Sequence, residues 1–215
     1  MKLSKEQRKY LARAWETYAP HLGEAEGWLA GRGISLEQAE SAGLGVVRDA
    51  LPGHETASGY LAIPYLTDAG PVNFNFRCMR DHDCKTIPDH SKYWKRKGSP
   101  VNLYGVQSLA WADDWAVVCE GELDAIVWHM IGVPAIGIPG AENWKPHWAN
   151  VLEDFSRVYL AEDGDKAGGD LWRAMSDHVD QSNTMVVRMR MPDGEDSGSM
   201  YLKHGKDYLL GRIKK

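Results

Sequence analysis

Acidic residues follow two short apolar runs in the second half of the chain. Residues 115–119 (WAVVC) lead into Glu120, and residues 158–162 (VYLAE) lead into Asp163 and Asp165. Carboxylates gathered in one place repel one another unless cations neutralise them, and oxygen ligands favour hard cations such as Mg²⁺ or Mn²⁺ over zinc. In phosphoryl transfer such ions neutralise developing charge and align the attacking and leaving oxygens. The sequence therefore predicts metal-assisted chemistry on phosphates.

The same acids have a simpler interpretation. Acidic residues near a helix N-terminus stabilise the helix dipole without any metal, and a lone Glu-Gly or Asp-x-Asp is usually no more than that. Here two such motifs occur together, and a third acidic cluster lies at residues 193–196 (DGED) after another apolar run. The combination favours a cation site.

The elements that must position these acids alternate along the second half of the chain. We expect strands at residues 115–120, 133–138, 156–163 and 184–189, and helices at residues 122–131, 144–155 and 166–179. This alternation predicts a mainly parallel sheet covered on both faces, with ligands bound beyond the carboxyl ends of its strands. Gly121 and Gly164 are expected at the sharp turns from strand to helix.

The first half of the chain has a different pattern. Up to about residue 42 apolar side chains recur at helical spacing, and Ser35 with Gln38 predicts a capping box that opens a short helix. Residues 44–76 show short extended runs, and residues 78–105 are expected to form one long polar loop. We divide the chain into a mixed α/β basic subdomain at 1–110 and a metal-binding catalytic domain at 111–215.

Charge is unevenly distributed along the chain, although the total is only -5. Residues 71–97 hold seven Lys or Arg against three Asp, a net +4, which suits a segment that holds a polyanion. Within it, residues 92–97 (KYWKRK) mix aromatics with cations, as in segments that bind a single nucleic-acid strand; a solvated charged loop is the simpler alternative. Because neither a secretion signal nor an 18-residue apolar stretch is present, we expect a cytoplasmic protein.

Three cysteines make no disulfide framework. Cys78, His82, Cys84 and His90 could be considered as a zinc site, but the C-x5-C spacing differs from the usual knuckle and no second pair follows. We therefore do not expect zinc, and interpret these four as surface residues of a polar loop.

Three longer stretches resemble the TOPRIM domain of DnaG-type bacterial and phage primases: VVCEGELDAIVWHMIGVPAIGIPG, VYLAEDGDKAGGDLWRAM and MPDGEDSGSMYLKHGKDYL. WLAGRGISLEQAESAGLGVV, YLAIPYLTDAGPVNFNFR and SKYWKRKGSPVNLYG resemble the region that precedes that domain. The resemblance covers about residues 22–212 in the same order. It implies an α/β fold in which an α+β N-terminal subdomain is followed by a Rossmann-like TOPRIM domain.

The resemblance also implies roles for individual residues. The catalytic acids would be Glu120, Asp163 and Asp165, and the metal ligands those three with Asp124 and Asp196. Ser197 and Gly198 stand where the family has a proline and a second acid, which puts one ligand in question. Arg77 and Lys92 match basic residues that line the family's groove for template and nucleoside triphosphate. To these we add the other cations of the basic segment and the lysine beside the acid pair: Arg80, Lys85, Lys95, Arg96, Lys97 and Lys166.

The implied function is that of a phage-encoded DNA primase core, a nucleotidyltransferase that makes short RNA primers on single-stranded DNA during replication. A TOPRIM nuclease and a non-catalytic single-strand-binding subunit are the alternatives. The implied partners are template DNA, ribonucleoside triphosphates, a separate zinc-binding module and a replicative helicase, with no membrane. Such a protein would work in the cytoplasm of the bacterial host.

Overall fold

A computed structural model describes residues 2–179 and 184–213. The chain forms two compact units, Met1–Pro100 and Val101–Lys215. Residues 101–110, which the sequence analysis assigned to the first subdomain, belong with the second unit. Tyr104 forms a β-bridge with Gly137, and the Ser108 hydroxyl donates to the Ala135 carbonyl at 2.8 Å. These long-range contacts fix the segment to the second unit.

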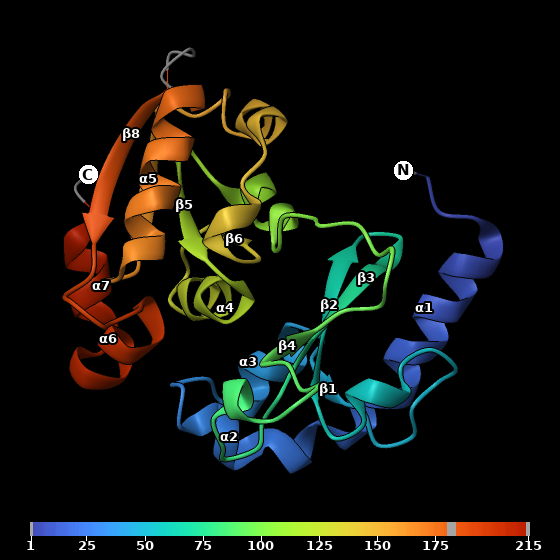
Figure 1. The fold of residues 1–215 in the computed structure, drawn as a ribbon. Coiled ribbons are helices and arrows are strands. Elements are labelled where there is room, and N and C mark those ends of the chain that lie inside the picture. The colour runs from blue at the N-terminus through green and yellow to red at the C-terminus, as the bar shows by residue number, and fades with distance from the viewer. Residues whose placement is uncertain (1, 180–183, 214–215) are drawn as a thin grey trace. The chain divides into compact units, whose positions relative to one another are not determined.

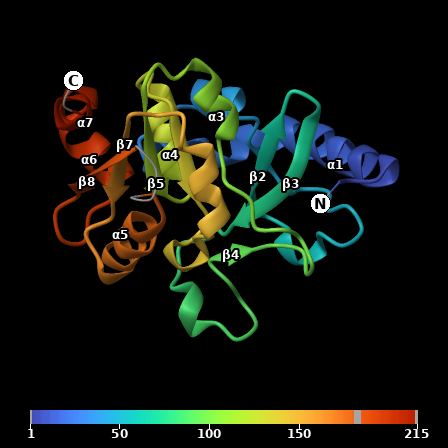
Figure 2. The ribbon, with the colours of Figure 1, turned by 90° about the horizontal axis from the view of Figure 1, so that it is seen from above.

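The first unit begins with helices. They are α1 (Lys5–Tyr18), α2 (Glu26–Ala30) and α3 (Leu36–Ser41), joined or followed by the 3₁₀ turns η1 (Ala19–Ala25) and η2 (Glu55–Ala57). Ser35 caps α3 by accepting a hydrogen bond from the Gln38 backbone N–H, which confirms the predicted helix start. The α1 helix lies along the sheet of this unit (Figure 2).

That sheet is antiparallel, in the order β1 (Gly45–Val46), β2 (Leu61–Thr67), β3 (Gly70–Arg77) and β4 (Tyr93–Trp94). The prediction of one continuous loop at 78–105 was wrong, because the segment contains β4 and the 3₁₀ turn η3 (Cys84–Thr86). Strand β4 forms because the edge of β3 offers unpaired backbone groups: Phe76 pairs with Trp94, and the Cys78 N–H donates to the Lys92 carbonyl. The loop therefore leaves the sheet after β3 and returns to it at β4.

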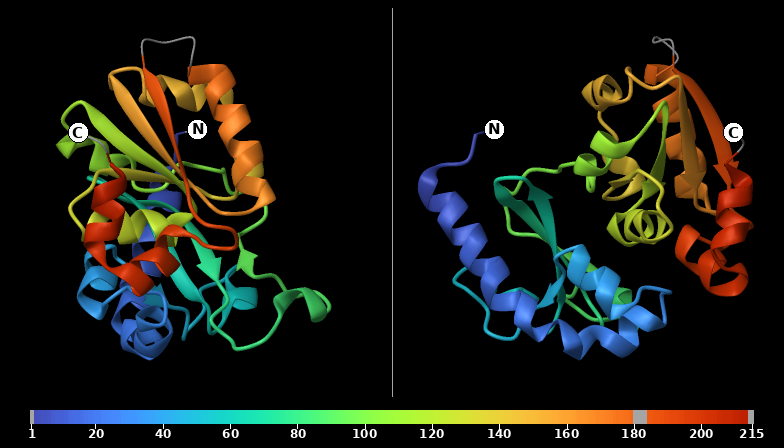
Figure 3. Two further views of the ribbon diagram at one scale, coloured as in Figure 1. Left: turned by 90° about the vertical axis from the view of Figure 1, so that its left-hand side faces the viewer. Right: turned by 180° about the vertical axis from the view of Figure 1, so that it is seen from behind.

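The second unit is built on four parallel strands, β5 (Trp115–Glu120), β6 (Ala135–Ile138), β7 (Arg157–Glu162) and β8 (Met185–Arg190), in the order β6-β5-β7-β8. Its helices are α4 (Glu122–Met130), α5 (Lys166–Val179), α6 (Ser197–His204) and α7 (Lys206–Arg212), with 3₁₀ turns η4 (Val106–Trp111), η5 (Ala141–Asn143) and η6 (Pro146–Val151). The predicted parallel α/β fold is thus confirmed. Figure 1 shows α5 alongside β8, and Figure 3 shows α6 and α7 following one another after that strand.

The prediction of an α-helix at residues 144–155 was wrong. The segment forms η6 and further i→i+3 turns, in which Trp148 donates to Lys145 and Leu152 donates to Ala149. Trp148, Leu152 and Phe155 still bury their side chains in the core. The apolar residues that the helical spacing selected are therefore buried as expected, although the hydrogen bonds of the segment are of the 3₁₀ type.

Helices cover both faces of the parallel sheet. Leu171 and Met175 of α5 share a core cluster with Val118 and Leu160 on one face. On the other face α4 approaches closely at Gly137, where a Cβ would lie 3.4 Å from that of Ala125. The chain runs outward from β5 to β6 and then returns past β5 to β7, so the strand order reverses between β5 and β7. Ligands of open α/β sheets bind at such a reversal, beyond the carboxyl ends of the strands.

No helix among the described residues is long and apolar enough to cross a membrane.

Candidate metal site and basic segment

Two predicted acids lie at the strand-order reversal. Glu120 ends β5, and Asp163 directly follows β7, the parallel neighbour of β5. The Asp163 backbone N–H donates to Glu120 Oε1 at 3.3 Å. The position of these two acids thus follows from the sheet topology.

Three further acids are each oriented by a backbone N–H. Asp165 Oδ1 accepts from Gly168 at the start of α5, at 3.0 Å. Asp196 is the N-cap of α6, and its Oδ1 accepts from Ser199 at 2.7 Å. Asp124, in the first turn of α4, accepts from Gly198 at 3.0 Å. The helix-start interpretation is therefore correct for the local bonds of Asp165 and Asp196, whereas Asp124 of α4 bonds to α6, and it does not explain why so many acids lie near one another.

The other four predicted acids lie near enough to Asp163 for their charges to act on it, and we call the five the acidic cluster. Burial, and then the negative charges of Asp124, Glu120, Asp196 and Asp165 in that order, together raise the pKa of Asp163 to about 9. Every acid predicted as a metal ligand therefore acts on Asp163. Like charges at short range disfavour ionisation unless a cation is added.

Glu120 is perturbed in the same direction. Its pKa is raised to about 7, chiefly by burial; the hydrogen bond from the Asp163 N–H opposes the rise, and the charges of Asp165, Glu162 and Glu142 contribute to it. Glu142 lies in η5, which follows β6 at the same edge of the sheet. Glu142 was not among the acids predicted as ligands. The rule that singled out acids after the other strands would have found it.

The donor set fits a hard divalent cation. Asp163 Oδ1 is buried and has no hydrogen-bond partner within the described part of the chain. A buried carboxylate oxygen without a partner needs an explanation, and an ion is one. Five carboxylates in one cluster supply the oxygen ligands that Mg²⁺ or Mn²⁺ prefers.

Glu162 stands beside this cluster but differs from it. It is fully buried, and its carboxylate receives hydrogen bonds from Arg188 Nε at 2.5 Å and Arg188 Nη2 at 2.8 Å. Arg190 Nε lies 3.6 Å from Glu162 Oε1. Because two arginines of β8 neutralise it, Glu162 is a structural acid. The two arginines at alternate positions in an apolar strand were the sequence signal for this pair.

The positions that depart from the family pattern have other roles in this structure. Gly198 provides the backbone N–H that orients Asp124. The buried Ser197 hydroxyl accepts a hydrogen bond from Trp128 Nε1 at 3.1 Å, which joins α4 to α6. Where the family has a second acid, this chain therefore has a backbone N–H that positions the carboxylate of Asp124.

Both predicted turn glycines are required where they stand. Gly121 has φ +93°, in the region that L side chains rarely adopt. At Gly164 a Cβ would lie 1.8 Å from the Pro192 carbonyl oxygen, so no other residue fits without moving the backbone. Gly164 thereby keeps the loops after β7 and β8 together.

Arg77, expected in a template groove, is only 6% exposed. Its Nη1 donates to the carbonyls of Cys78 at 3.0 Å and Lys92 at 3.2 Å, and its guanidinium lies over the Trp28 and Tyr93 rings at 5.5 and 5.0 Å. In this structure Arg77 joins the two ends of the loop between β3 and β4.

The other predicted cations are exposed: Arg80, Lys85, Lys92, Lys95, Arg96, Lys97 and Lys166. Of the two aromatics in the KYWKRK run, Trp94 is half-buried against Phe76, at 5.4 Å between ring centroids. Tyr93 is 38% exposed. Of these two rings, Tyr93 is the more available to a base.

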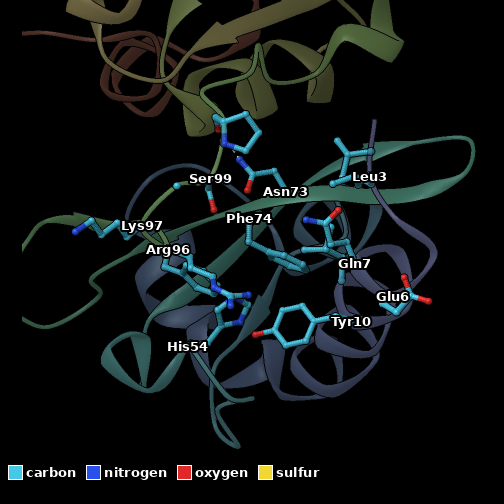
Figure 4. A pocket seen from close by; sticks show the side chains of 15 residues that line it. Leu3, Glu6, Gln7, Tyr10, His54, Asn73, Phe74, Arg96, Lys97 and Ser99 are labelled. Carbon is cyan, nitrogen blue, oxygen red and sulfur yellow. Dashed lines mark hydrogen bonds between the residues drawn. The ribbon is translucent and has the colours of Figure 1, made fainter. Parts of the chain in front are cut away.

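A cavity of about 440 Å³ lies in the first unit between α1, β3 and residues 96–100. Figure 4 shows Tyr10, His54 and Phe74 around it, with Arg96 beside them and Lys97 at its edge. The Arg96 guanidinium lies over the Tyr10 ring at 5.5 Å. The cavity thus combines aromatic walls with two cations from the basic segment.

The interpretation of Cys78 and Cys84 as surface residues was wrong. Cys78 is 2% exposed and Cys84 9% exposed, and one ligand atom from each of Cys78, His82, Cys84 and His90 lies within 4.8 Å of the others. They come together because β4 brings the loop back to β3, a pairing that local spacing does not reveal.

Comparison with known proteins agrees with this arrangement. Residues 117–201, which contain all five clustered acids, match the Toprim-like family. The chain is 32% identical over 156 residues to the Gene 57 protein of Mycobacterium phage D29, covering 72% of this chain and 98% of that protein. It is 27% identical over 233 residues to the DNA primase of Pseudomonas putida, covering 90% of this chain and 35% of that protein. The chain thus spans about a third of that primase's length.

The fold has close counterparts among solved structures. The RNA polymerase domain of Mycobacterium tuberculosis primase DnaG superposes with a TM-score of 0.75 at 21% identity, covering 99% of this chain and 84% of that one. The fold, the Toprim match and the phage relative agree with one another. The chain belongs to the DnaG-type primase family, as a phage-type catalytic core with a Toprim domain.

Proposed function

We propose that this chain synthesises short RNA primers on single-stranded DNA during phage replication, in a reaction that depends on Mg²⁺ or Mn²⁺. The observation that carries the proposal is the partnerless, buried Asp163 oxygen beside Glu120 at the strand-order reversal. A hard cation would satisfy that oxygen and neutralise the cluster. Relatives named DNA primase and primase RNA polymerase domain support this choice of reaction.

The residues of the cluster would have different roles in binding the ions. Glu120, Asp163 and Asp165 would hold the ions, and Asp124 and Asp196 would complete the set. Bound ions supply charge neutralisation at the transferring phosphate and lower the pKa of a coordinated hydroxyl. Because the pKa values of Asp163 and Glu120 are raised, these two residues would release protons when metal ions bind.

The basic segment would bind the nucleic acid and the triphosphates. Six exposed cations lie between β3 and Gly98, and positively charged side chains at the surface are suited to phosphate contacts. Tyr93 would stack on a base, and Lys166, next to Asp165, would contact a phosphate. Arg77 would act through the loop whose ends it joins. We also propose a separate zinc-binding module and a replicative helicase as partners, in the host cytoplasm.

The test is incorporation of labelled ribonucleotides on a single-stranded template, with Mg²⁺ and Mn²⁺ compared. Asp163→Ala should lower synthesis by about 100-fold or more, as when one electrostatic group of an active site is removed. Asp193→Asn is the matched control, because the Asp193 side chain is 89% exposed and pairs with Arg190. Unchanged synthesis by Asp163→Ala would contradict the proposal.

Two other outcomes would indicate a different function. Metal-dependent cleavage of labelled DNA without incorporation would indicate a nuclease on the same acids. Tight binding of single strands with neither reaction would indicate a binding subunit. Each outcome is read from the same purified chain, so the three functions are separated in one set of assays.

A further inference from the structure

We propose that Cys78, His82, Cys84 and His90 form a structural zinc site in the first unit. The spacing is C-x3-H-x-C-x5-H within 13 residues. Each residue offers a ligand atom, and the four atoms lie within 4.8 Å of one another. Two thiolates and two imidazoles are a common donor set for tetrahedral zinc.

The separations between ligand atoms suit one central ion. His82 Nε2 lies 2.9 Å from His90 Nε2, and Cys78 Sγ lies 3.7 Å from His82 Nε2. With zinc–nitrogen bonds of about 2.0–2.1 Å and zinc–sulfur bonds of about 2.3 Å, a tetrahedral site has edges of about 3.3 Å between nitrogens and 3.6 Å between nitrogen and sulfur. Small shifts of the side chains would make room for the ion.

The surroundings of His90 also resemble those of a metal ligand. Its Nε2 lies 2.9 Å from His82 Nε2, and the Tyr60 hydroxyl lies 3.1 Å from its Nδ1 and 3.4 Å from its Nε2. That hydroxyl in turn donates to the Ser91 carbonyl at 3.1 Å. A ligating histidine almost always donates its second ring N–H to a neighbouring acceptor, which fixes the ring orientation. Tyr60 is therefore assigned as a positioning residue.

The ligand chemistry separates this site from the acidic cluster. Sulfur and nitrogen donors select zinc, whereas the five carboxylates select a hard ion. All four protein donors point to the same centre, which is the arrangement of a structural site with no open position for substrate. The zinc inference is independent of the proposed primase activity.

A bound zinc would hold the loop between β3 and β4. That loop carries the exposed cations Arg80 and Lys85. At its ends, Arg77 contacts the carbonyls of Cys78 and Lys92, and between them local turns such as Asp83 with Thr86 supply much of the order. A bound metal would add to the stability of this segment, because the free energy of binding contributes to folding.

The experiment measures zinc in the untagged full chain, purified under reducing conditions and dialysed against metal-free buffer. We expect one zinc per chain by elemental analysis, and loss of stoichiometric zinc in Cys84→Ser and in His90→Gln. Matched controls are Cys119→Ser, which changes the remaining cysteine, and His147→Gln, which changes an exposed histidine outside the loop. Both controls should keep their zinc.

Two further measurements keep the proposal testable if a cysteine variant fails to fold. Cobalt substituted into the wild-type chain should show thiolate-to-metal charge transfer and the visible bands of four-coordinate cobalt. Tyr60→Phe should weaken zinc binding by about 10–100-fold in competition with a chelator. Circular dichroism establishes that each variant is folded.

The result that would overturn the site is a reduced, folded wild-type chain that takes up no stoichiometric zinc. Zinc retained equally by Cys84→Ser and His90→Gln would also overturn it, because the ion would then lie elsewhere. A Cys78–Cys84 disulfide with no zinc uptake after reduction would contradict the proposal as well. None of these assays uses nucleotide or DNA, so their failure leaves the primase proposal standing.

Discussion

Replacing Asp163 by Asn should stabilise the chain without added Mg²⁺ or Mn²⁺ and remove most of the stabilisation that these ions give. Burial and the charges of four neighbouring carboxylates together raise the pKa of Asp163 to about 9. An unfolded Asp titrates near its usual value of about 3.9. Between these two values the unfolded chain has lost a proton that the folded chain keeps, so stability falls as pH rises toward the folded pKa.

The magnitude follows from this difference of one bound proton. Each pH unit within the window lowers the free energy of unfolding by about 1.4 kcal/mol. Asn carries no proton to lose, so the difference between Asp163→Asn and wild type should grow with pH at about that slope between pH 5 and 8. Adding Mg²⁺ to about 100 times its dissociation constant should stabilise the wild type by about 2.7 kcal/mol, and the variant by much less.

Denaturant unfolding at pH 5, 6, 7 and 8, with and without Mg²⁺, measures both effects. Asp193→Asn is the control, because its exposed side chain lies outside the perturbed cluster, and it should follow the wild type. The reasoning would be refuted by a variant whose stability runs parallel to that of the wild type across this pH range. Equal stabilisation of both proteins by Mg²⁺ would refute the assignment of Asp163 as a ligand.

Three other predictions concern one residue of the cavity in the first unit and two residues beside the acidic cluster. Burial, with the Arg96 charge adding, lowers the pKa of His54 to about 4; stability from this group should fall by about 3 kcal/mol as pH drops from 6.5 to 4, and His54→Leu should flatten that part of the unfolding profile. Gly168→Ala would place a Cβ 2.5 Å from the Asp163 carbonyl and 2.7 Å from Glu120 Oε1, so it should lose about 1–3 kcal/mol in denaturant unfolding and weaken Mg²⁺ binding in calorimetry. Arg188→Met should lose about 1.5–3 kcal/mol through its hydrogen bonds to Glu162; a stability equal to wild type would mean that Arg190 alone neutralises that acid.

The parallel sheet could be predicted because its sequence signals are local. Apolar runs such as 115–119 and 158–162 have strand length, and the intervening helices have their own periodicity. Once strands alternate with helices, the carboxyl ends of β5 and β7 must share an edge, and Glu120 and Asp163 come together by topology. The acids at the site could therefore be predicted from the sequence alone.

The features that could not be predicted depend on pairing between distant segments. Nothing local indicates that residues 93–94 return to the edge of β3, and that return brings Cys84 and His90 next to Cys78. The η6 segment has helical spacing but 3₁₀ bonding, which the apolar pattern does not distinguish. Arg77 was identified as a functional cation by its match to basic residues of the family, whereas its burial follows from the same β3–β4 pairing.

Glu162 and Asp163 are adjacent acids at one edge of one sheet, and the structure treats them in opposite ways. Parallel register places Arg188 and Arg190 of β8 against Glu162, so its buried charge is fully balanced. Asp163 has a buried oxygen without a partner and four acids acting on it. A protein that can neutralise one buried acid with two arginines has the means to neutralise its neighbour. Because it does not do so, Asp163 keeps its proton in the folded chain until a cation replaces that proton, which is the condition a site needs in order to bind a cation and the triphosphate that the cation accompanies.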